Sequence, residues 1–387
     1  MKMNVNGRVK LFLCIAVGVA AAVAMGQQVQ SAVHADKFSY PYGSKQFTQL
    51  VDDSYRENRL GDAKQFYAWF EKVFRQWRYG GKPGPGLNSV AAQQKHRLEQ
   101  VASTSAKASG EAQFAAWLHG MVKKTIPHFN LDTGFEFCNA ALRGDRQCLL
   151  QSVLIAAILQ EAGIDAGIAM VCRNSEGQDS NNGHVVTLVK LSDGEDLLVD
   201  ASHPEPYVPH QRLLMRTTTY VYVQPVYSKG RNTIVSYIAV GSHKKLPTAK
   251  VRPLDYNFVR SQFYFYRGER AKGGLLYRDR TAAGLAAEER ELKKSVRLCP
   301  GNPLAVYMLG RLHLMQGKTK LAATELTRAY DLYRSYGWVP QGVKDCYSLL
   351  RDRLAAHLRD KQPQHSRLHQ KRPQLRHSLN WPSQTHI

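Results

Sequence analysis

The chain is poor in acidic residues. Only 31 of its 387 residues are Asp or Glu, against 53 Lys and Arg, and the formal net charge is +22. Lys2, Arg8 and Lys10 are the only charged side chains of residues 1–35, so the remainder still carries +19. An excess of this size favours association with acidic polymers, such as those of a cell envelope, or with anionic membrane surfaces.

Several binding signatures are missing. No basic stripe with interleaved aromatic residues accompanies the positive charge. The net charge is then the only feature that favours nucleic-acid binding, and we do not expect nucleic acid as a partner. The glycine-rich stretch 79–88 lacks a phosphate-binding pattern, which argues against a nucleotide site. A hydrophobic fraction of 43% excludes a globally disordered chain.

Only one long apolar run is present, and it lies at the N-terminus. Leu11–Met25 follows a basic stretch that ends at Lys10, and small residues offer cleavage sites after Gly26 or Ala35. The run has 15 residues, short of the roughly 20 that span a bilayer. This layout predicts a signal peptide over 1–35 and an exported protein, periplasmic or secreted, with no transmembrane span in the mature chain.

Cysteine is scarce, and its count is uneven. Cys14 lies in the apolar run, which leaves five cysteines in the exported chain: Cys138, Cys148, Cys172, Cys299 and Cys346. An odd number leaves at least one thiol free or joined to a partner. Pairs Cys299–Cys346 and Cys138–Cys172 would leave Cys148 free, but spacing does not fix connectivity.

The N-terminal region, 36–130, is predicted to be helical. Aromatic and apolar residues recur at three- and four-residue spacing within a predicted helix over 44–78, as expected for a helix that faces a core. Further helices are predicted over 89–103 and 110–124.

The next region, 131–245, mixes helix and strand. An apolar helix over 149–162 ends at Gly163, and a strand over 164–171 follows. A polar loop is predicted over 173–183. Two β-branched runs, 184–191 and 196–201, then flank a turn and indicate a hairpin. More strands are predicted over 217–226 and 232–241.

The C-terminal region, 246–360, is predicted to be helical, over 283–298 and 303–333. Seven residues stand at the spacing of a tetratricopeptide repeat: Val306, Leu309, Gly310, Gly317, Ala322, Leu326 and Ala329. One such unit is too few for an independent stack, so we expect these helices to pack against the rest of the protein.

The tail, 361–387, is basic, has no acidic residue and is predicted to be disordered. His365 and His369 are four residues apart, which would suit a metal pair, but no further ligands with defined spacing accompany them. A solvated tail is the better interpretation, and we expect no metal and no cofactor.

Cys148 opens the apolar helix and is the candidate nucleophile. A helix N-terminus places partial positive charge beside the sulfur, which favours the thiolate, and Arg146 could add to it. The backbone N–H of Cys148 is a candidate donor to a developing oxyanion, and Gln147 is a weaker candidate for the second donor. A nucleophile of this kind needs a base nearby and a group that orients the base.

His184 and Asp200 lie on the two hairpin strands, and the register decides whether they meet. A two-residue loop, Asp193–Gly194, would put them on opposite faces. A three-residue loop that ends at Gly194 pairs His184 with Ser202 and makes Asp200 a diagonal neighbour on the same face. We favour the second register, because three-residue hairpins commonly end in a left-handed residue.

These features together resemble the transglutaminase-like superfamily. The resemblance rests on a cysteine that opens a helix, on an LxxAGIxA helix ending at 159–166, on Gly183–His184 opening a strand, and on Leu198–Val199–Asp200 closing the next. It covers 135–202. It implies a papain-like α+β core in which Cys148 is the nucleophile, His184 the base and Asp200 its orienting partner.

The resemblance has departures. Arg146, Val186 and Ala201 stand where members of the family often have glycine, an aromatic residue and proline. We therefore expect either thiol-dependent acyl transfer on a protein or peptide amide, as a protease, amidase or transglutaminase, or a catalytically silent fold that binds a protein or an envelope polymer. Each of the three residues also has a plain structural interpretation, as a buried thiol, a strand histidine and a turn aspartate.

Overall fold

The computed structural model describes residues 39–361. The chain divides into two compact units, one up to Tyr347 and one from Ser348 onward. The predicted signal peptide, His365, His369 and the tail beyond residue 361 lie outside the described residues. None of the described helices is both long and apolar enough to cross a membrane.

The described chain mixes helix and sheet, as the α+β prediction requires. Its helices are α2 (Lys45–Glu57), α3 (Lys64–Tyr79), α4 (Leu87–Glu99), α5 (Thr104–Thr125), α6 (Phe137–Arg143), α7 (Cys148–Glu161), η1 (Thr248–Lys250), α8 (Tyr256–Glu269), α9 (Ala282–Leu298), α10 (Pro303–Met315), α11 (Thr319–Ser335) and α12 (Gln341–Lys361). Its strands are β1 (His128–Phe129), β2 (Asp145–Arg146), β3 (Ala166–Arg173), β4 (Asp179–Lys190), β5 (Asp196–Val199), β6 (Arg212–Arg216), β7 (Tyr220–Tyr227), β8 (Thr233–Ala239) and β9 (Lys245–Pro247).

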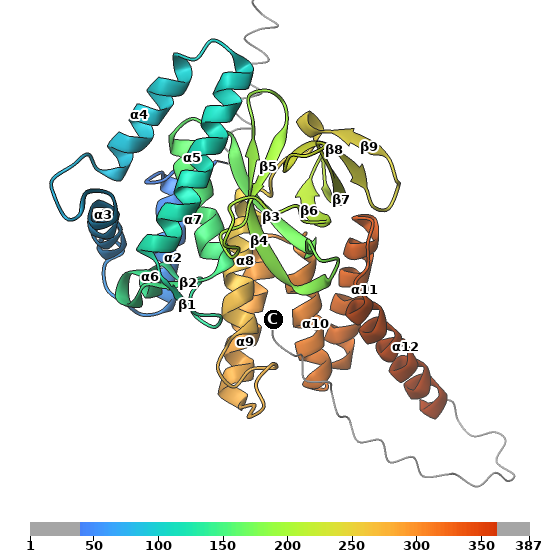
Figure 1. Cartoon of the computed structure of the whole chain (residues 1–387). Helices are drawn as coiled ribbons and strands as arrows, with labels where there is room; N and C mark the ends of the chain where they lie inside the picture. The colour runs from blue at the N-terminus through green and yellow to red at the C-terminus, as the bar shows by residue number, and fades with distance from the viewer. Residues whose placement is uncertain (1–38, 362–387) are drawn as a thin grey trace, which may run out of the picture. The chain divides into compact units, whose positions relative to one another are not determined.

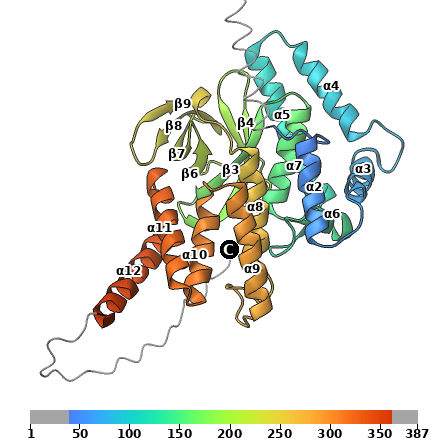
Figure 2. The same ribbon diagram turned by 180° about the vertical axis from the view of Figure 1, so that it is seen from behind.

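Six antiparallel strands close into a barrel. Their order is β5-β4-β3-β6-β7-β8, and β8 pairs back with β5, while β9 extends the sheet beyond β8. Helices α2 to α7 gather on one side of this barrel in both views (Figures 1 and 2). Closure removes free strand edges, and it was not part of the sequence-based prediction.

Strand alternation divides the apolar residues into two cores. In β4, for example, Val186 and Leu188 point into the barrel, whereas Val185 and Val189 belong to the larger core that the helices build. This period of two is what a pleated strand produces. The barrel therefore has its own small interior, and its outer face carries α7.

Helix α7 packs against β3 and β4. Every residue from Cys148 to Leu159 is buried. Ser152, polar in an apolar helix, donates from its hydroxyl to the carbonyl of Val185 at 3.0 Å and accepts through its own carbonyl from the Thr187 hydroxyl at 3.0 Å. Because buried polar groups need such partners, these bonds fix where the start of α7 lies relative to β4.

Two predicted helical stretches are each divided in the structure. The stretch 44–78 breaks between α2 and α3, where Arg59 adopts a left-handed φ of 54°. The stretch 303–333 breaks between α10 and α11 at Gly317, with φ 73°. In both places a residue in the left-handed region ends the helix.

Other predictions need correction as well. The predicted loop 173–183 is largely strand, because β4 begins at Asp179, which pairs with Arg173. A tight turn suffices there: the side chain of Asn174 accepts from the amide of Gln178 at 2.8 Å. Strand β6 and helix α8 were not predicted.

The suggested disulfides are wrong. The five described cysteines are buried, and none of them forms a disulfide. The Cys138 thiol instead contacts the Ser54 hydroxyl at 3.4 Å, and Cys299 Sγ lies 3.3 Å from the Tyr220 hydroxyl. Each of these thiols is therefore a packed core group with its own polar neighbour.

Candidate functional site

The β4–β5 hairpin has the predicted register. Lys190 pairs with Asp196, and the amide of Leu191 donates to the carbonyl of Glu195 at 2.9 Å. Three residues remain for the loop, and the last of them, Gly194, has a φ of 87°. The left-handed residue expected at the end of a three-residue hairpin is therefore present.

His184 and Asp200 meet at the open end of this hairpin. His184 donates from Nε2 to Asp200 Oδ2 at 2.9 Å. A second imidazole reaches the same oxygen, since His210 Nε2 lies 3.1 Å from it, and the amide of Ser202 donates to Asp200 Oδ1 at 2.9 Å. The carboxylate is buried and accepts from three groups, so its position is fixed.

Cys148 completes the group. It is the first residue of α7 and is only 7% exposed. Its thiol is near enough to His184 that each group shifts the pKa of the other. Since Nε2 of His184 is used by Asp200, Nδ1 is the ring nitrogen left to face the sulfur. The chain order Cys, His, Asp is thus also the spatial order of the contacts.

The three groups perturb one another's ionisation. Burial opposes the charged form of the Cys148 thiol, but the His184 hydrogen bond and charge, the backbone amide of Val185 and the charge of Arg270 outweigh it, so the thiol pKa is lowered. Burial also opposes the His184 imidazolium, yet its hydrogen bonds to Asp200 and Cys148 raise the His184 pKa to about 10. The arrangement favours a thiolate–imidazolium pair.

Asp200 is held in its charged form. Burial alone would raise the pKa of this carboxyl, but hydrogen bonds from His184 and His210 lower it well below its usual range. A permanent carboxylate beside one face of the His184 ring orients that ring and stabilises its cation.

The other cysteines behave differently. Burial raises the pKa of Cys138 to about 11 and that of Cys172 to about 12, and it also raises the pKa of Cys299. Among these buried thiols Cys148 stands apart because charged and donating groups surround it. That contrast is what a reactive cysteine requires.

Helix α8 adds a tyrosine to the site. The Tyr266 hydroxyl donates to the carbonyl of Gly183 at 2.6 Å and lies 4.0 Å from Cys148 Sγ. Tyr266 therefore links the residue before His184 to the surroundings of the Cys148 sulfur.

Gln147, our weaker candidate for an oxyanion donor, acts as the helix cap. Its side-chain oxygen accepts from the Leu149 amide at 3.2 Å, which leaves its NH₂ group as the donor. The Cys148 amide is a first-turn amide, which has no acceptor within its own helix. The Cys148 amide thus stays available as a donor beside the sulfur.

Three residues of the site were missed by sequence reasoning: His210, Tyr266 and Arg270. His203, a histidine close to Asp200 in the sequence, is exposed in a turn, where its carbonyl accepts from Lys123 and His119. Arg146 is partly buried, and burial lowers its own pKa. The cation that acts on the thiol is Arg270.

His184, Asp200 and His210 could also hold a metal ion, because one ligand atom of each lies within 4.8 Å of the others. Two imidazoles and one carboxylate are a common ligand set. Against this use, Nδ1 of His210 is buried and has no partner among the described residues, whereas metal-bound histidines almost always donate from their second nitrogen.

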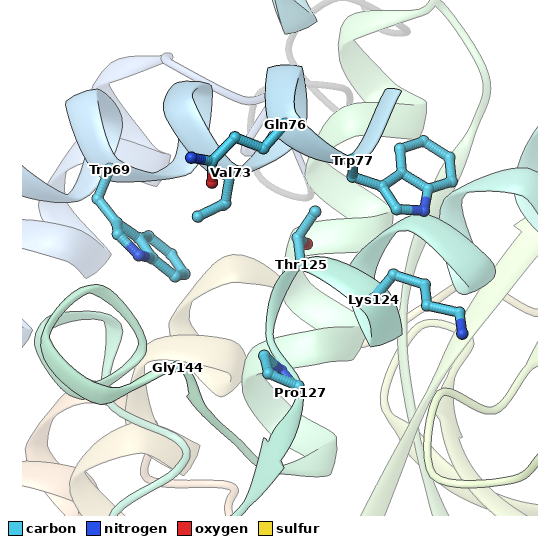
Figure 3. A pocket seen from close by; sticks show the side chains of 8 residues that line it. All are labelled: Trp69, Val73, Gln76, Trp77, Lys124, Thr125, Pro127 and Gly144. Atoms are coloured by element: carbon cyan, nitrogen blue, oxygen red, sulfur yellow. The ribbon is translucent and has the colours of Figure 1, made fainter. Parts of the chain in front are cut away.

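A separate hollow of about 410 Å³ lies beside α3 (Figure 3). Trp69 and Val73 come down from α3 toward Gly144 and Pro127, whereas the side chains of Trp77 and Lys124 extend to one side. None of the residues that line it is a nucleophile paired with a base. This hollow therefore offers no paired nucleophile and base.

Compared with protein-family models, with curated proteins and with solved structures, the chain gives no match in any of the three.

Proposed function

We propose that this chain is an exported enzyme that transfers an acyl group from an amide through a thioester on Cys148. The observation that carries the proposal is the His184 imidazole, which the buried Asp200 carboxylate orients near the thiol that opens α7; this imidazole also lowers the pKa of Cys148. Covalent catalysis is recognised by a nucleophile next to a base that a third group holds in place. The resemblance to transglutaminase-like domains with a papain-like core supports the same assignment.

The chemistry balances with these groups alone. The Cys148 thiolate attacks the amide carbonyl carbon, and the resulting oxyanion is stabilised by the Cys148 amide. The carbon–nitrogen bond breaks as the His184 imidazolium gives its proton to the leaving amine. Water then attacks the thioester and passes a proton to His184, which regenerates the thiolate and makes the reaction a hydrolysis. A second amine in place of water makes it a transamidation.

The test is to trap the acyl group. The protein is incubated with p-nitrophenyl acetate, digested and analysed by mass spectrometry. An acetyl group on the Cys148 peptide in the wild type, absent in Cys148→Ala, is expected. Acetylation that persists elsewhere at the same rate in Cys148→Ala, with none on Cys148 in the wild type, would overturn the assignment and leave the fold as a binding module.

The second candidate is metal-dependent hydrolysis at His184, Asp200 and His210, which their mutual proximity favours. The two proposals differ in what abolishes turnover of the same ester. A metal enzyme loses it on treatment with EDTA and keeps it in Cys148→Ala. A thiol enzyme keeps its turnover in EDTA and loses it in Cys148→Ala.

A further inference from the structure

Arg270 lies next to the thiol, at the end of α8. Its guanidinium carbon is 3.9 Å from the centre of the Tyr266 ring and 5.7 Å from that of Phe135. The hydroxyl of the same tyrosine is 4.0 Å from Cys148 Sγ. The cation, the ring and the sulfur therefore form one continuous group.

This guanidinium has few partners. Its side chain is only 11% exposed, and Nη1 is buried without a hydrogen-bond partner among the described residues. Its nearest carboxylate, that of Glu269, is 3.6 Å away, beyond hydrogen-bond distance. Burial raises the pKa of Glu269, so this carboxylate is a weak counter-ion.

Arg267, one turn earlier in α8, shows the contrast. It donates from Nε and Nη2 to the two oxygens of Glu136 at 2.6 and 2.8 Å. That bidentate pair joins α8 to the start of α6 and neutralises the charge, although Nη1 of Arg267 is also buried without a partner among the described residues. Arg270 has the same fork of donors near the sulfur, but no carboxylate of the described residues lies within hydrogen-bond distance of it.

A buried guanidinium without a hydrogen-bonded partner is costly, and aromatic faces offset only part of that cost. Its planar fork fits a carboxylate in two parallel hydrogen bonds. We propose that Arg270 binds a carboxylate on the acyl donor, so that the amide attacked by Cys148 belongs to an acidic peptide or a similar anionic substrate. This inference rests on the proposed function of Cys148.

The test compares two alkylating reagents that differ by one charge. Iodoacetate carries a carboxylate beside the carbon that sulfur attacks, and iodoacetamide is its neutral counterpart. Their rates at Cys148 are measured by mass spectrometry in the full chain, for the wild type, Arg270→Gln and Arg270→Lys. Arg278→Gln is the matched control, because it removes the same charge from an exposed position.

The rate with iodoacetate divided by that with iodoacetamide is expected to fall about tenfold in Arg270→Gln, the effect of losing one charge-assisted hydrogen bond. Arg270→Lys is expected to keep part of the preference, and Arg278→Gln all of it. A ratio in Arg270→Gln within twofold of the wild type would overturn the inference.

The same data separate this inference from the proposed function. The iodoacetamide rate alone reports whether Cys148 is activated, and the ratio can be measured even for a sluggish thiol. A slow wild-type thiol with an Arg270-dependent ratio would refute acyl transfer but keep an anion site. A fast wild-type thiol with a ratio that does not change in Arg270→Gln would support acyl transfer but refute the anion site. A thermal melt of Arg270→Gln checks folding, and the lysine variant gives the ratio if the glutamine variant does not fold.

Discussion

The two ends of the β4–β5 hairpin each bury an aspartate, and the partners differ. At the turn end, Asp196 lies 2.7 Å from the Lys190 ammonium and accepts from the Tyr237 hydroxyl at 2.7 Å. At the open end, Asp200 accepts from His184 and His210. One carboxylate faces a fixed cation, and the other faces imidazoles that can take up or release a proton.

The difference in partners appears in the ionisation. Burial raises the pKa of Asp196 to about 6 despite Lys190, whereas the two imidazoles hold the pKa of Asp200 well below its usual range. The Lys190 ammonium is further bound by the carbonyls of Thr248 and Val251 at 2.7 and 3.0 Å. The turn end therefore joins parts of the barrel, and the open end has a charge that can act on a reacting group.

His184→Ala should give the largest effect. The lowered pKa of Cys148 predicts that alkylation by iodoacetamide is already fast at mildly acidic pH, because the thiolate is the nucleophile. Without the imidazole, a thiol with a pKa of about 8.5 is only about 0.3% ionised at pH 6. We expect the rate at pH 6 to fall about 10²-fold. A pH profile identical to that of the wild type would remove His184 from the site.

Asp196→Asn should lower the stability of the fold and leave the reactivity of Cys148 unchanged. It leaves the Lys190 ammonium without its counter-charge, and breaking a buried pair costs about 3 kcal/mol. Urea denaturation at pH 7 measures the free energy of unfolding. Alkylation of Cys148 in the folded variant is expected to stay within twofold of the wild type, and a larger change would show that the two ends of the hairpin are coupled.

Asp200→Asn is the matched change at the open end. An amide cannot stabilise the imidazolium as a carboxylate does, so the pKa of His184 should move from about 10 toward its ordinary value of about 6.5. A neutral imidazole stabilises the thiolate less, so the pKa of Cys148 should rise toward that of an ordinary thiol, and the alkylation rate at pH 8 should fall about fourfold. A rate at pH 8 equal to that of the wild type would mean that Asp200 does not control His184.

Sequence reasoning found the residues that local signals place. Gly163 marks the end of α7, and Gly194 fixes the register that brings His184 to Asp200. Both signals act within a few residues of the elements that they position. The backbone at position 194 is left-handed, which favours glycine. The glycine in the sequence therefore indicates the turn.

The residues that sequence reasoning missed depend on distant contacts. Tyr266 reaches Cys148 across 118 positions of the chain, and its helix, α8, is buried on most of its faces. A helix of that kind has no clear apolar stripe for periodicity to detect. His210 precedes β6, which pairs with β3, and a pairing between strands about 40 residues apart has no local signature in the sequence.

Gly194→Ala should give the smallest effect and tests what holds the register. A Cβ at this position would meet nothing within 4 Å, so the cost comes from the φ of 87° alone. We expect a loss of about 1 kcal/mol in the free energy of unfolding, and less for Gly194→Asn, because asparagine tolerates left-handed backbone. Alkylation at Cys148 should be unchanged, because a slip by one residue would turn Val186 and Leu188 out of the barrel interior. Slower alkylation in Gly194→Ala at full folding would instead mean that the turn, and not the barrel core, keeps His184 beside Asp200.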